Sequence, residues 1–292
     1  MTPARLEAFS LSPKAKNWIN ASGDARLLHV FTDACNLINA RGEVLSLVNP
    51  IIGNGPFSVI VENATSLASL DIQSSVSLNR YNIQIGEFCV DVSRASLWEA
   101  SPNWEHIHAH RDNICKHLPL LESLQKASQP SESMAVLPGP ASSTSITPIT
   151  RKFHENIENL IKSIQYNDFV LLADSSQNLI GLGIGLTPAG DDFLVGLMLG
   201  LQAILGDPAE QLCQLMVRDI QGKTTSLSAA WLHAAACGEA GEVWHDFLFA
   251  LTRSDDAAVE SRMRKILSIG HTSGSDALAG FLQVVQIMRM AA

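Results

Sequence analysis

Hydrophobic and polar residues alternate along the first third of the chain in a pattern that is typical of β-strands. Short segments rich in β-branched residues bury one face and expose the other. Turn-forming sequences such as Gly53-Asn-Gly-Pro56 separate them. No long helical period lies between these segments, which favours an antiparallel sheet or a small barrel. The predicted strands cover residues 27–31, 44–48, 57–61, 70–73 and 81–92.

From about residue 98 onward the apolar residues recur at intervals of three and four, the period of an amphipathic helix. Residues 104–126 are predicted to be mostly helical, with an interruption near Pro119 because proline has no amide hydrogen. The later helices are rich in small residues, which let helix axes approach closely, and this indicates a compact bundle. They are expected at residues 153–165, 193–205, 210–221, 228–240, 242–252, 257–267 and 276–289.

Together these patterns predict an α+β protein, with an N-terminal antiparallel β-sheet or small barrel followed by a mainly α-helical C-terminal domain. A β-rich domain that ends in helix is expected at residues 1–126, and the helical domain at residues 151–292. Residues 127–150 are rich in Pro and Ser and bury too little apolar surface to offset their ordering entropy. They are expected to form a linker or a surface loop.

Composition and charge exclude several classes of partner. The 292 residues carry 20 Lys and Arg against 29 Asp and Glu, a net charge of −9, with no basic cluster for a nucleic acid. The longest apolar run, residues 193–205, is shorter than the roughly 18 residues that cross a bilayer, so no membrane partner is expected. Five widely spaced cysteines and the lack of an export signal predict reduced thiols in the cytoplasm.

The most unusual segment is Gly181-Leu-Gly-Ile-Gly-Leu-Thr-Pro-Ala-Gly-Asp-Asp192, directly before the apolar run. Its glycines permit left-handed backbone conformations and the close approach of a ligand. Thr187 and Pro188 together signal a helix start, with the threonine hydroxyl as the cap and proline at the first helical position. Backbone amides would then converge at a helix N-terminus behind a glycine loop, an arrangement that binds anions.

A weaker copy of this segment, Gly270-His-Thr-Ser-Gly-Ser-Asp276, opens a later apolar helix. The two helix N-termini are expected to face one cavity, with the hydroxyl-rich residues 223–228 as a third wall. His271 would be the one titratable group near this cavity that changes protonation at neutral pH. Both segments read Gly-x-Thr-x-x-x-Asp, and aligning them pairs Gly185 with Gly270, Thr187 with Thr272 and Asp191 with Asp276.

Both segments also have a purely structural interpretation, because Gly and Thr before a helix are ordinary caps. The first segment exceeds what a cap requires. It adds two glycines and the adjacent Asp191 and Asp192 beside a very apolar helix, where uncompensated charge is costly. These carboxylates would favour the helix dipole, bind a metal together with the substrate, or orient a hydroxyl or amide. For the second segment alone, function and structure are equally supported.

Two other features invite a functional reading and have a simpler one. Asn54 and Gly55 could deliver backbone groups to a ligand, although a plain turn explains the same sequence. His106, His108 and His110 suggest a metal site, but no acidic or Cys partner stands at a recognisable ligand spacing, so a solvated helix face is favoured. No nucleotide-binding lysine loop, dinucleotide fingerprint or serine nucleophile elbow is present in the sequence.

Three segments resemble the signatures of one bacterial family, long catalogued as a domain of unknown function. That family includes the AllH subunit of oxamate carbamoyltransferase, found with allantoin-degradation genes. The resemblance runs from the first strands to Phe281. The segments are Gly53-Asn-Gly-Pro56, Gly183-Ile-Gly-Leu-Thr-Pro-Ala-Gly-Asp-Asp-Phe-Leu-Val-Gly196 and Ile269-Gly-His-Thr-Ser-Gly-Ser-Asp-Ala-Leu-Ala-Gly-Phe281.

The resemblance implies a part in purine breakdown, as a subunit of an enzyme that converts oxalurate and phosphate to oxamate and carbamoyl phosphate with other subunits. All four molecules are anionic or rich in carbonyls, and loop amides at helix N-termini suit them without lysines. The catalytic candidates implied are Asp191 and Asp192, which would orient the substrate or a divalent ion, and His271 as a proton donor. The substrate-binding candidates are Asn54, Gly55, Gly183, Gly185, Thr187, Gly190, Thr272, Ser273 and Asp276.

Two alternatives stay open on the sequence alone. The chain could be a non-catalytic protein that binds a small anion or serves assembly, or both Gly-x-Thr segments could be packing devices. The sequence leaves the metal and the cofactor unknown, with Mg²⁺ as one candidate.

Overall fold

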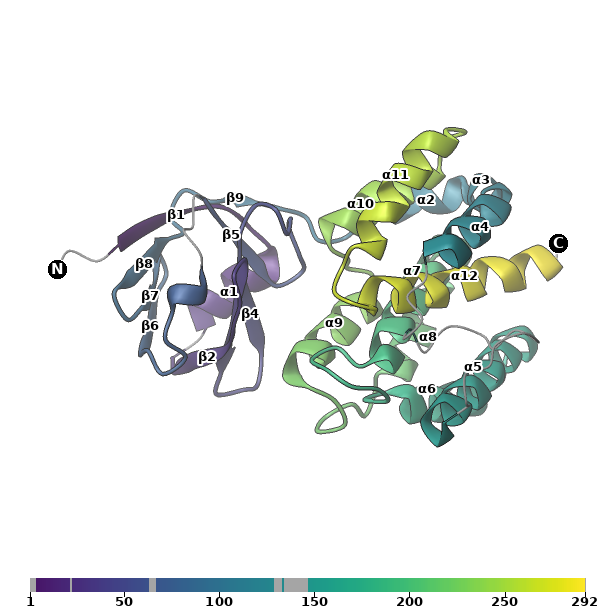
Figure 1. Cartoon of the computed structure of the whole chain (residues 1–292), viewed down its shortest axis with the longest axis horizontal. Coiled ribbons are helices and arrows are strands. Elements are labelled where there is room, and N and C mark those ends of the chain that lie inside the picture. The colour runs from purple at the N-terminus through teal and green to yellow at the C-terminus, as the bar shows by residue number, and fades with distance from the viewer. Residues whose placement is uncertain (1–3, 22, 63–66, 129–132, 134–146, 292) are drawn as a thin grey trace. The chain divides into compact units, whose positions relative to one another are not determined.

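The computed structural model describes residues 4–21, 23–62, 67–128, 133 and 147–291. The chain divides into two compact units. The barrel unit comprises Met1–Ser101 and Ala240–Glu242, and the helical unit comprises Pro102–Glu239 and Val243–Ala292. Strands build the first and helices the second (Figure 1), which confirms the predicted α+β class with a sheet or small barrel followed by a mainly helical region.

The barrel unit holds a nearly closed, barrel-like sheet of eight strands in the order β2-β3-β4-β5-β1-β8-β7-β6, with β9 paired to β1. Five described pairings are antiparallel. The sheet is nevertheless mixed, since β1 runs parallel to β8 and β9, and β4 runs parallel to β5. The strands are β1 (Ala4–Leu11), β2 (Ala25–Val30), β3 (Ala34–Asn39), β4 (Val44–Val48), β5 (Ser58–Glu62), β6 (Val76–Asn79), β7 (Asn82–Ile85), β8 (Phe88–Asp91) and β9 (Ser96–Leu97).

The strand predictions hold for β2, β4 and β5 and fail in two places. Residues 70–73 form no strand; they follow the short 3-10 helix η1 (Leu67–Ser69) as bends and turns. Residues 81–92 form the two strands of a hairpin, because the chain reverses at Gly86, whose φ of 53° is left-handed. Strands β1, β3, β6 and β9 were not predicted. The partners of β1, which are β5, β8 and β9, are all distant from it in sequence.

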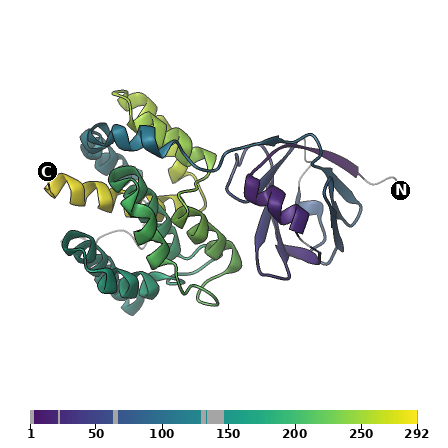
Figure 2. The ribbon, with the colours of Figure 1, turned by 180° about the vertical axis from the view of Figure 1, so that it is seen from behind.

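One apolar cluster fills the barrel unit, and the helix α1 (Pro13–Ala21) contributes Ala15, Trp18 and Ile19 to it. Figure 2 shows this helix lying against the strands. The Trp18 indole nitrogen donates a hydrogen bond of 3.0 Å to the Glu43 carbonyl oxygen, which ties the helix to the turn before β4. The barrel unit therefore has its own core.

The predicted helices of the second unit are all present, with somewhat different ends. The chain breaks at His110 and again at His117, which lies near Pro119 as predicted. Pro119 itself is the second residue of α4, where a missing amide hydrogen costs nothing. Helix α6 was not predicted. The helices are α2 (Trp104–Ala109), α3 (Arg111–Lys116), α4 (Leu118–Ser128), α5 (Pro148–Tyr166), α6 (Phe169–Leu179), α7 (Ala189–Leu205), α8 (Pro208–Met216), α9 (Ser226–Ala236), α10 (Glu242–Leu251), α11 (Asp256–Leu267) and α12 (Ser273–Ala291).

Most of the predicted linker, residues 129–132 and 134–146, lies outside the described residues. All five cysteines are free thiols. Within the described part of the chain, no helix combines the length and the apolar character needed to span a membrane.

Helices α7 and α12 pack backbone to backbone in the middle of the helical unit (Figure 1). A Cβ atom on Gly196 would lie 1.7 Å from the Ala277 carbonyl oxygen, and one on Gly280 would lie 1.9 Å from that of Phe193. One turn farther along α7, a Cβ atom on Gly200 would lie 3.0 Å from the Cβ atom of Val284. Because the contacts advance in the same direction on both helices, α7 and α12 run parallel and begin at the same end. Their positive dipole ends therefore lie together.

Candidate functional site

The first glycine segment forms a loop that enters α7 one residue later than the sequence predicts. Helix α7 begins at Ala189, and Pro188 occupies the capping position, with an extended backbone (φ −55°, ψ 144°) and no side chain to cap. Thr187 as the cap and Pro188 as the first helical residue were therefore wrong. The Thr187 hydroxyl is instead available for another contact.

That contact joins the two Gly-x-Thr segments. The Thr187 Oγ1 atom lies 2.9 Å from Ser273 Oγ, the first residue of α12, and the two hydroxyls share a hydrogen bond. Both residues are half-buried, as is Thr272. The structure thus brings the openings of α7 and α12 into direct contact, through Ser273 and not through the aligned Thr272.

Asp191 is 1 % exposed, and the protein itself occupies both of its carboxylate oxygens. Oδ1 accepts a 2.8 Å bond from the Gly181 amide, while Oδ2 accepts the hydroxyls of Thr224 and of Ser228, the latter at 2.7 Å. Burial raises the pKa of Asp191, and these three donors oppose that effect. Since three donors from the loop and from the start of α9 engage both of its oxygens, Asp191 holds the glycine loop and the start of α9 to α7.

Residues 223–228, expected as a third wall, do lie against the first glycine segment. Besides Thr224 and Ser228, the Thr225 hydroxyl donates a 2.5 Å bond to the Leu186 carbonyl oxygen while also capping α9. The hydroxyl-rich sequence therefore fixes the loop from a second side.

Asp192 has a different environment from that of its neighbour. Its Oδ2 atom is buried and accepts no hydrogen bond from the described residues. Burial raises the pKa of Asp192 to about 7, against the lowering effect of the Ser273 and Thr187 hydroxyls, and the carboxylates of Asp276 and Asp191 raise it further. The carboxyl beside the joined hydroxyls therefore changes protonation near neutral pH.

The glycine loop leaves several backbone amides open. Within the described part of the chain, the amides of residues 183–186 donate no hydrogen bond. Gly183 and Gly185 have φ values of 133° and 96°, which only glycine adopts readily. Gly190 differs, because its amide donates to the Leu182 carbonyl oxygen and a Cβ there would lie 2.1 Å from that of Leu179. Gly190 thus serves the close packing of loop on helix.

Asp276 and His271 flank the second opening in different ways. Asp276 is fully buried, and its Oδ1 atom accepts a 2.6 Å bond from the hydroxyl of Ser133, a residue that no sequence motif singled out. His271 is exposed. The Asp192 carboxyl, which was expected to orient the substrate or a metal, lies at the joined openings and has a pKa of about 7.

Asn54 and Gly55 belong to the barrel unit, where protein groups occupy them. The Asn54 amide and side-chain Nδ2 both donate 2.8 Å bonds to Glu242 Oε2, and Asn54 Oδ1 accepts a 2.6 Å bond from Ser10. The Gly55 amide donates a 2.6 Å bond to Ser58 Oγ. This network matches the plain-turn alternative. No local sequence signal points to Glu242.

No set of three His, Cys, Asp or Glu side chains in the described residues is arranged to hold a metal ion. In the histidine segment, His106 faces the Thr252 hydroxyl at 3.3 Å, and Arg111 lies 3.0 Å from His108 Nε2. His106, His108 and His110 are all half-buried and contact neighbouring helices and side chains, so this helix face is partly covered and not solvated as the sequence favoured.

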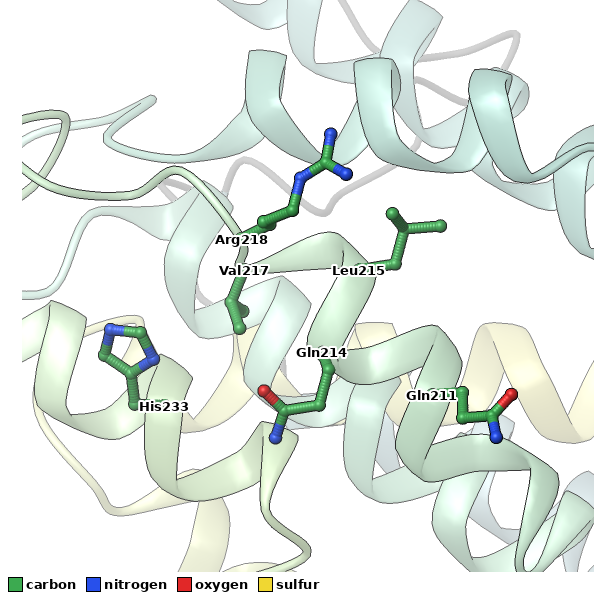
Figure 3. Close-up of a pocket in the computed structure, with 6 residues that line it drawn as sticks. All are labelled: Gln211, Gln214, Leu215, Val217, Arg218 and His233. Carbon is green, nitrogen blue, oxygen red and sulfur yellow. The ribbon is translucent and has the colours of Figure 1, made fainter.

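A hollow on the helical unit lies between α8 and α9 (Figure 3). It contains no glycine loop and no carboxylate, and none of the predicted site residues lines it. Its lining residues are Gln211, Gln214, Leu215, Val217, Arg218 and His233.

Comparison with known protein families gives two matches. A model described as the AllH family N-terminal domain matches residues 8–97, and one described as oxamate carbamoyltransferase subunit AllH matches residues 179–285. Together the matches cover more than half of the chain, and the second contains both Gly-x-Thr openings. No solved structure matches the chain.

Proposed function

The chain belongs to the AllH family, described as a subunit of oxamate carbamoyltransferase, and on this premise we propose that the joined openings of α7 and α12 bind the anionic substrates of that enzyme. In the proposed reaction, a phosphate oxygen bonds to the carbamoyl carbon of oxalurate while the bond from that carbon to the oxamate nitrogen breaks. The proton of hydrogen phosphate ends on this nitrogen. The products are carbamoyl phosphate and oxamate.

The observation that carries this proposal is the 2.9 Å contact between Thr187 and Ser273. It sets two parallel helix N-termini side by side, and aligned positive dipole ends favour a bound anion. The open amides of residues 183–186 add donors that need no rearrangement when charge develops on an oxygen of the substrate. A phosphate or carboxylate group is therefore the ligand that this opening suits best.

Asp192 supplies the proton transfer that the reaction requires. A carboxyl with a pKa of about 7 exists in both protonation states at neutral pH. It can accept the proton from phosphate and donate it to the departing nitrogen, and general acid and base catalysis works best with such a pKa. Protonated Asp192 also presents no negative charge to the incoming anion.

In this proposal Asp191 is a positioning residue, because all its hydrogen bonds run to the protein. His271 is the alternative proton donor. Replacing His271 by Gln separates the two: if Asp192 carries the proton, His271→Gln leaves the pH dependence of kcat unchanged.

The test is carbamoyl phosphate formation from oxalurate and phosphate by this chain assembled with the other carbamoyltransferase subunits. Asp192→Asn keeps the shape of the side chain and removes its titration, so kcat should fall by roughly 10²- to 10⁴-fold. The matched control is Asp174→Asn, an exposed carboxylate on α6, which should leave kcat unchanged.

Two outcomes would contradict the proposal. Unchanged turnover in the Asp192→Asn complex would remove Asp192 from the chemistry. No turnover by any complex, combined with a rise in Tm when phosphate, oxamate or carbamoyl phosphate is added, would identify a non-catalytic anion-binding protein.

A further inference from the structure

Asp192 and Asp276 lie at the same level of the paired helices α7 and α12. Asp192 stands four residues before Gly196 on α7, and Asp276 stands four residues before Gly280 on α12. These two glycines are the places where the helices touch. Since residues four apart share a helix face, both aspartates lie on the contact face, one turn nearer to the openings. The charge of Asp276 accordingly acts on Asp192.

The sequence repeat pairs these residues differently from the structure. Aligning the two Gly-x-Thr segments matches Asp276 with Asp191. In the structure, Asp191 accepts the hydroxyls of Thr224 and Ser228, which lie at the start of α9. The partner of Asp276 across the helix contact is therefore Asp192.

Two carboxyl groups at this place favour sharing one proton. Asp276 is fully buried, and so is the Oδ2 atom of Asp192. Both residues lie in the first turn of their helices, where the dipole stabilises negative charge. Two carboxylates in one buried site nevertheless repel each other, and a proton on either of them removes the repulsion.

The hydrogen bonds show which of the two keeps the charge. The Ser133 hydroxyl donates a 2.6 Å bond to Asp276 Oδ1, a length typical of a hydroxyl bonded to a charged carboxylate, and Ser133 is itself buried. Asp192 receives less, because Thr187 and Ser273 use one of their two hydroxyl hydrogens to bond each other. The negative charge therefore lies on Asp276 and the proton on Asp192.

Among the described residues, Asp191 is the other charged group that acts on Asp192, and it acts in the same direction as Asp276. His271, in the loop before α12, is exposed. His154 on α5 is mostly neutral at pH 7, because burial lowers its pKa from 6.5. Helices α9 and α4 present uncharged groups to the two openings, which are the hydroxyls of Thr224 and Ser228 and the amide of Gln125.

We propose that Asp276 is a positioning residue for the carbamoyl transfer, whose negative charge keeps the proton on Asp192, and that Ser133 holds this charge in place. The inference rests on the proposed function, because Asp192 transfers the proton there. It gives Asp276 a role other than binding the substrate, and it gives a role to Ser133.

The first experiment is an NMR titration of the aspartate carboxyl carbons in the isotope-labelled full-length chain, without substrates or other subunits. The Asp192→Asn and Asp276→Asn variants identify the two signals by their loss. In wild type the Asp192 signal should change near pH 7. Asp276→Asn keeps the shape of the side chain and removes the like charge, so the Asp192 midpoint should fall by roughly one pH unit.

Ser133→Ala is the milder variant, and it decides the question alone if Asp276→Asn does not fold. Without its donor Asp276 binds the proton more readily, so part of the titration near pH 7 should move from the Asp192 signal to the Asp276 signal. The matched control is Ser163→Ala. Ser163 is another buried serine, whose hydroxyl donates a 2.7 Å bond to the Leu160 carbonyl oxygen, and its loss should leave both signals unchanged.

An unchanged Asp192 midpoint in Asp276→Asn, unchanged signals in Ser133→Ala, or an equal change in Ser163→Ala would overturn the inference. The second measurement is the pH dependence of kcat in the assembled carbamoyltransferase, which should move to lower pH in Asp276→Asn by the same amount as the NMR midpoint. An NMR shift without a shift in kcat, or without turnover by any complex, would support the carboxyl pair and contradict the proposed function.

Discussion

Two loops of this protein contain a Gly-x-Gly sequence, at residues 53–55 and 183–185, and they differ in their hydrogen bonding. In the barrel unit, Asn54 and Gly55 donate their hydrogen bonds to Glu242 and Ser58. In the helical unit, the backbone amides of residues 183–186 donate no hydrogen bond to any described residue. A loop whose donors the protein already satisfies is a structural turn, and a loop whose donors stay open at a helix N-terminus is a candidate for binding a ligand.

The same contrast recurs between two adjacent carboxyl groups. Asp191 accepts three hydrogen bonds and anchors the fold, whereas the Asp192 Oδ2 atom accepts none within the described part of the chain. The hydrogen bonds to each carboxyl, and not the residue type, therefore distinguish the structural aspartate from the one with an oxygen left to interact with a ligand. Three experiments test this division between structural and functional polar groups.

The largest effect is expected for Asp191→Ala, which leaves the buried Ser228 hydroxyl and the half-buried Thr224 hydroxyl and Gly181 amide without their acceptor. The free energy of unfolding should fall by about 3–5 kcal/mol. Urea denaturation measures it, with Asp174→Ala as the control. A stability equal to wild type would mean that Asp191 is not an anchor.

A smaller loss is expected for Asn54→Ala, which removes the side-chain bonds to Glu242 and Ser10. We expect a destabilisation of about 1–3 kcal/mol. If the loop is structural, kcat and KM of the assembled enzyme measured below the unfolding temperature stay close to wild type. A rise in KM in the folded variant would instead indicate that Asn54 contacts the substrate.

The smallest effect concerns pH and Asp192. Burial raises the pKa of Asp192 from its ordinary value of 3.8 to about 7, so the folded state binds this proton more tightly than the unfolded state. The stability that the group contributes is fully present below pH 3.8 and is lost as the pH rises through about 7. Between pH 5 and pH 8 the Tm of wild type should therefore fall more than that of Asp192→Asn, by about 2–4 °C. Parallel Tm curves for the two proteins would show that the carboxyl is not buried as described.

Periodicity was sufficient to predict the division into a β-rich and a helical part and most of the C-terminal helices. The apolar spacing located α7 and α12, and the repeated Gly-x-Thr pattern related their N-termini, which the contact between Thr187 and Ser273 joins. Strand β1 was missed because a strand is recognised by its partners, and those of β1 are distant along the chain. The parallel pairings have the same origin, since local sequence does not encode which distant strand a segment joins.

The candidate site was predictable only as a group of residues, not by role. Asp191 and Asp192 are identical in type and adjacent, and the helix turns about 100° between them, which sends one carboxyl to the α9 hydroxyls and the other to the opening. Nothing in the sequence says which is which. The contact of Glu242 with Asn54 could not be predicted either, because it joins residues far apart in the chain.

The short segment Ala240–Glu242, which ends on the first residue of α10, determines how the molecule can be divided. Ala240–Glu242 belong to the barrel unit, although the helical unit contains the residues on both sides. The polypeptide therefore passes from one unit to the other three times, and neither unit is a single uninterrupted stretch. A cut after Ser101 gives a C-terminal fragment that still carries Glu242 but has lost Asn54, so that truncation cannot isolate either unit intact.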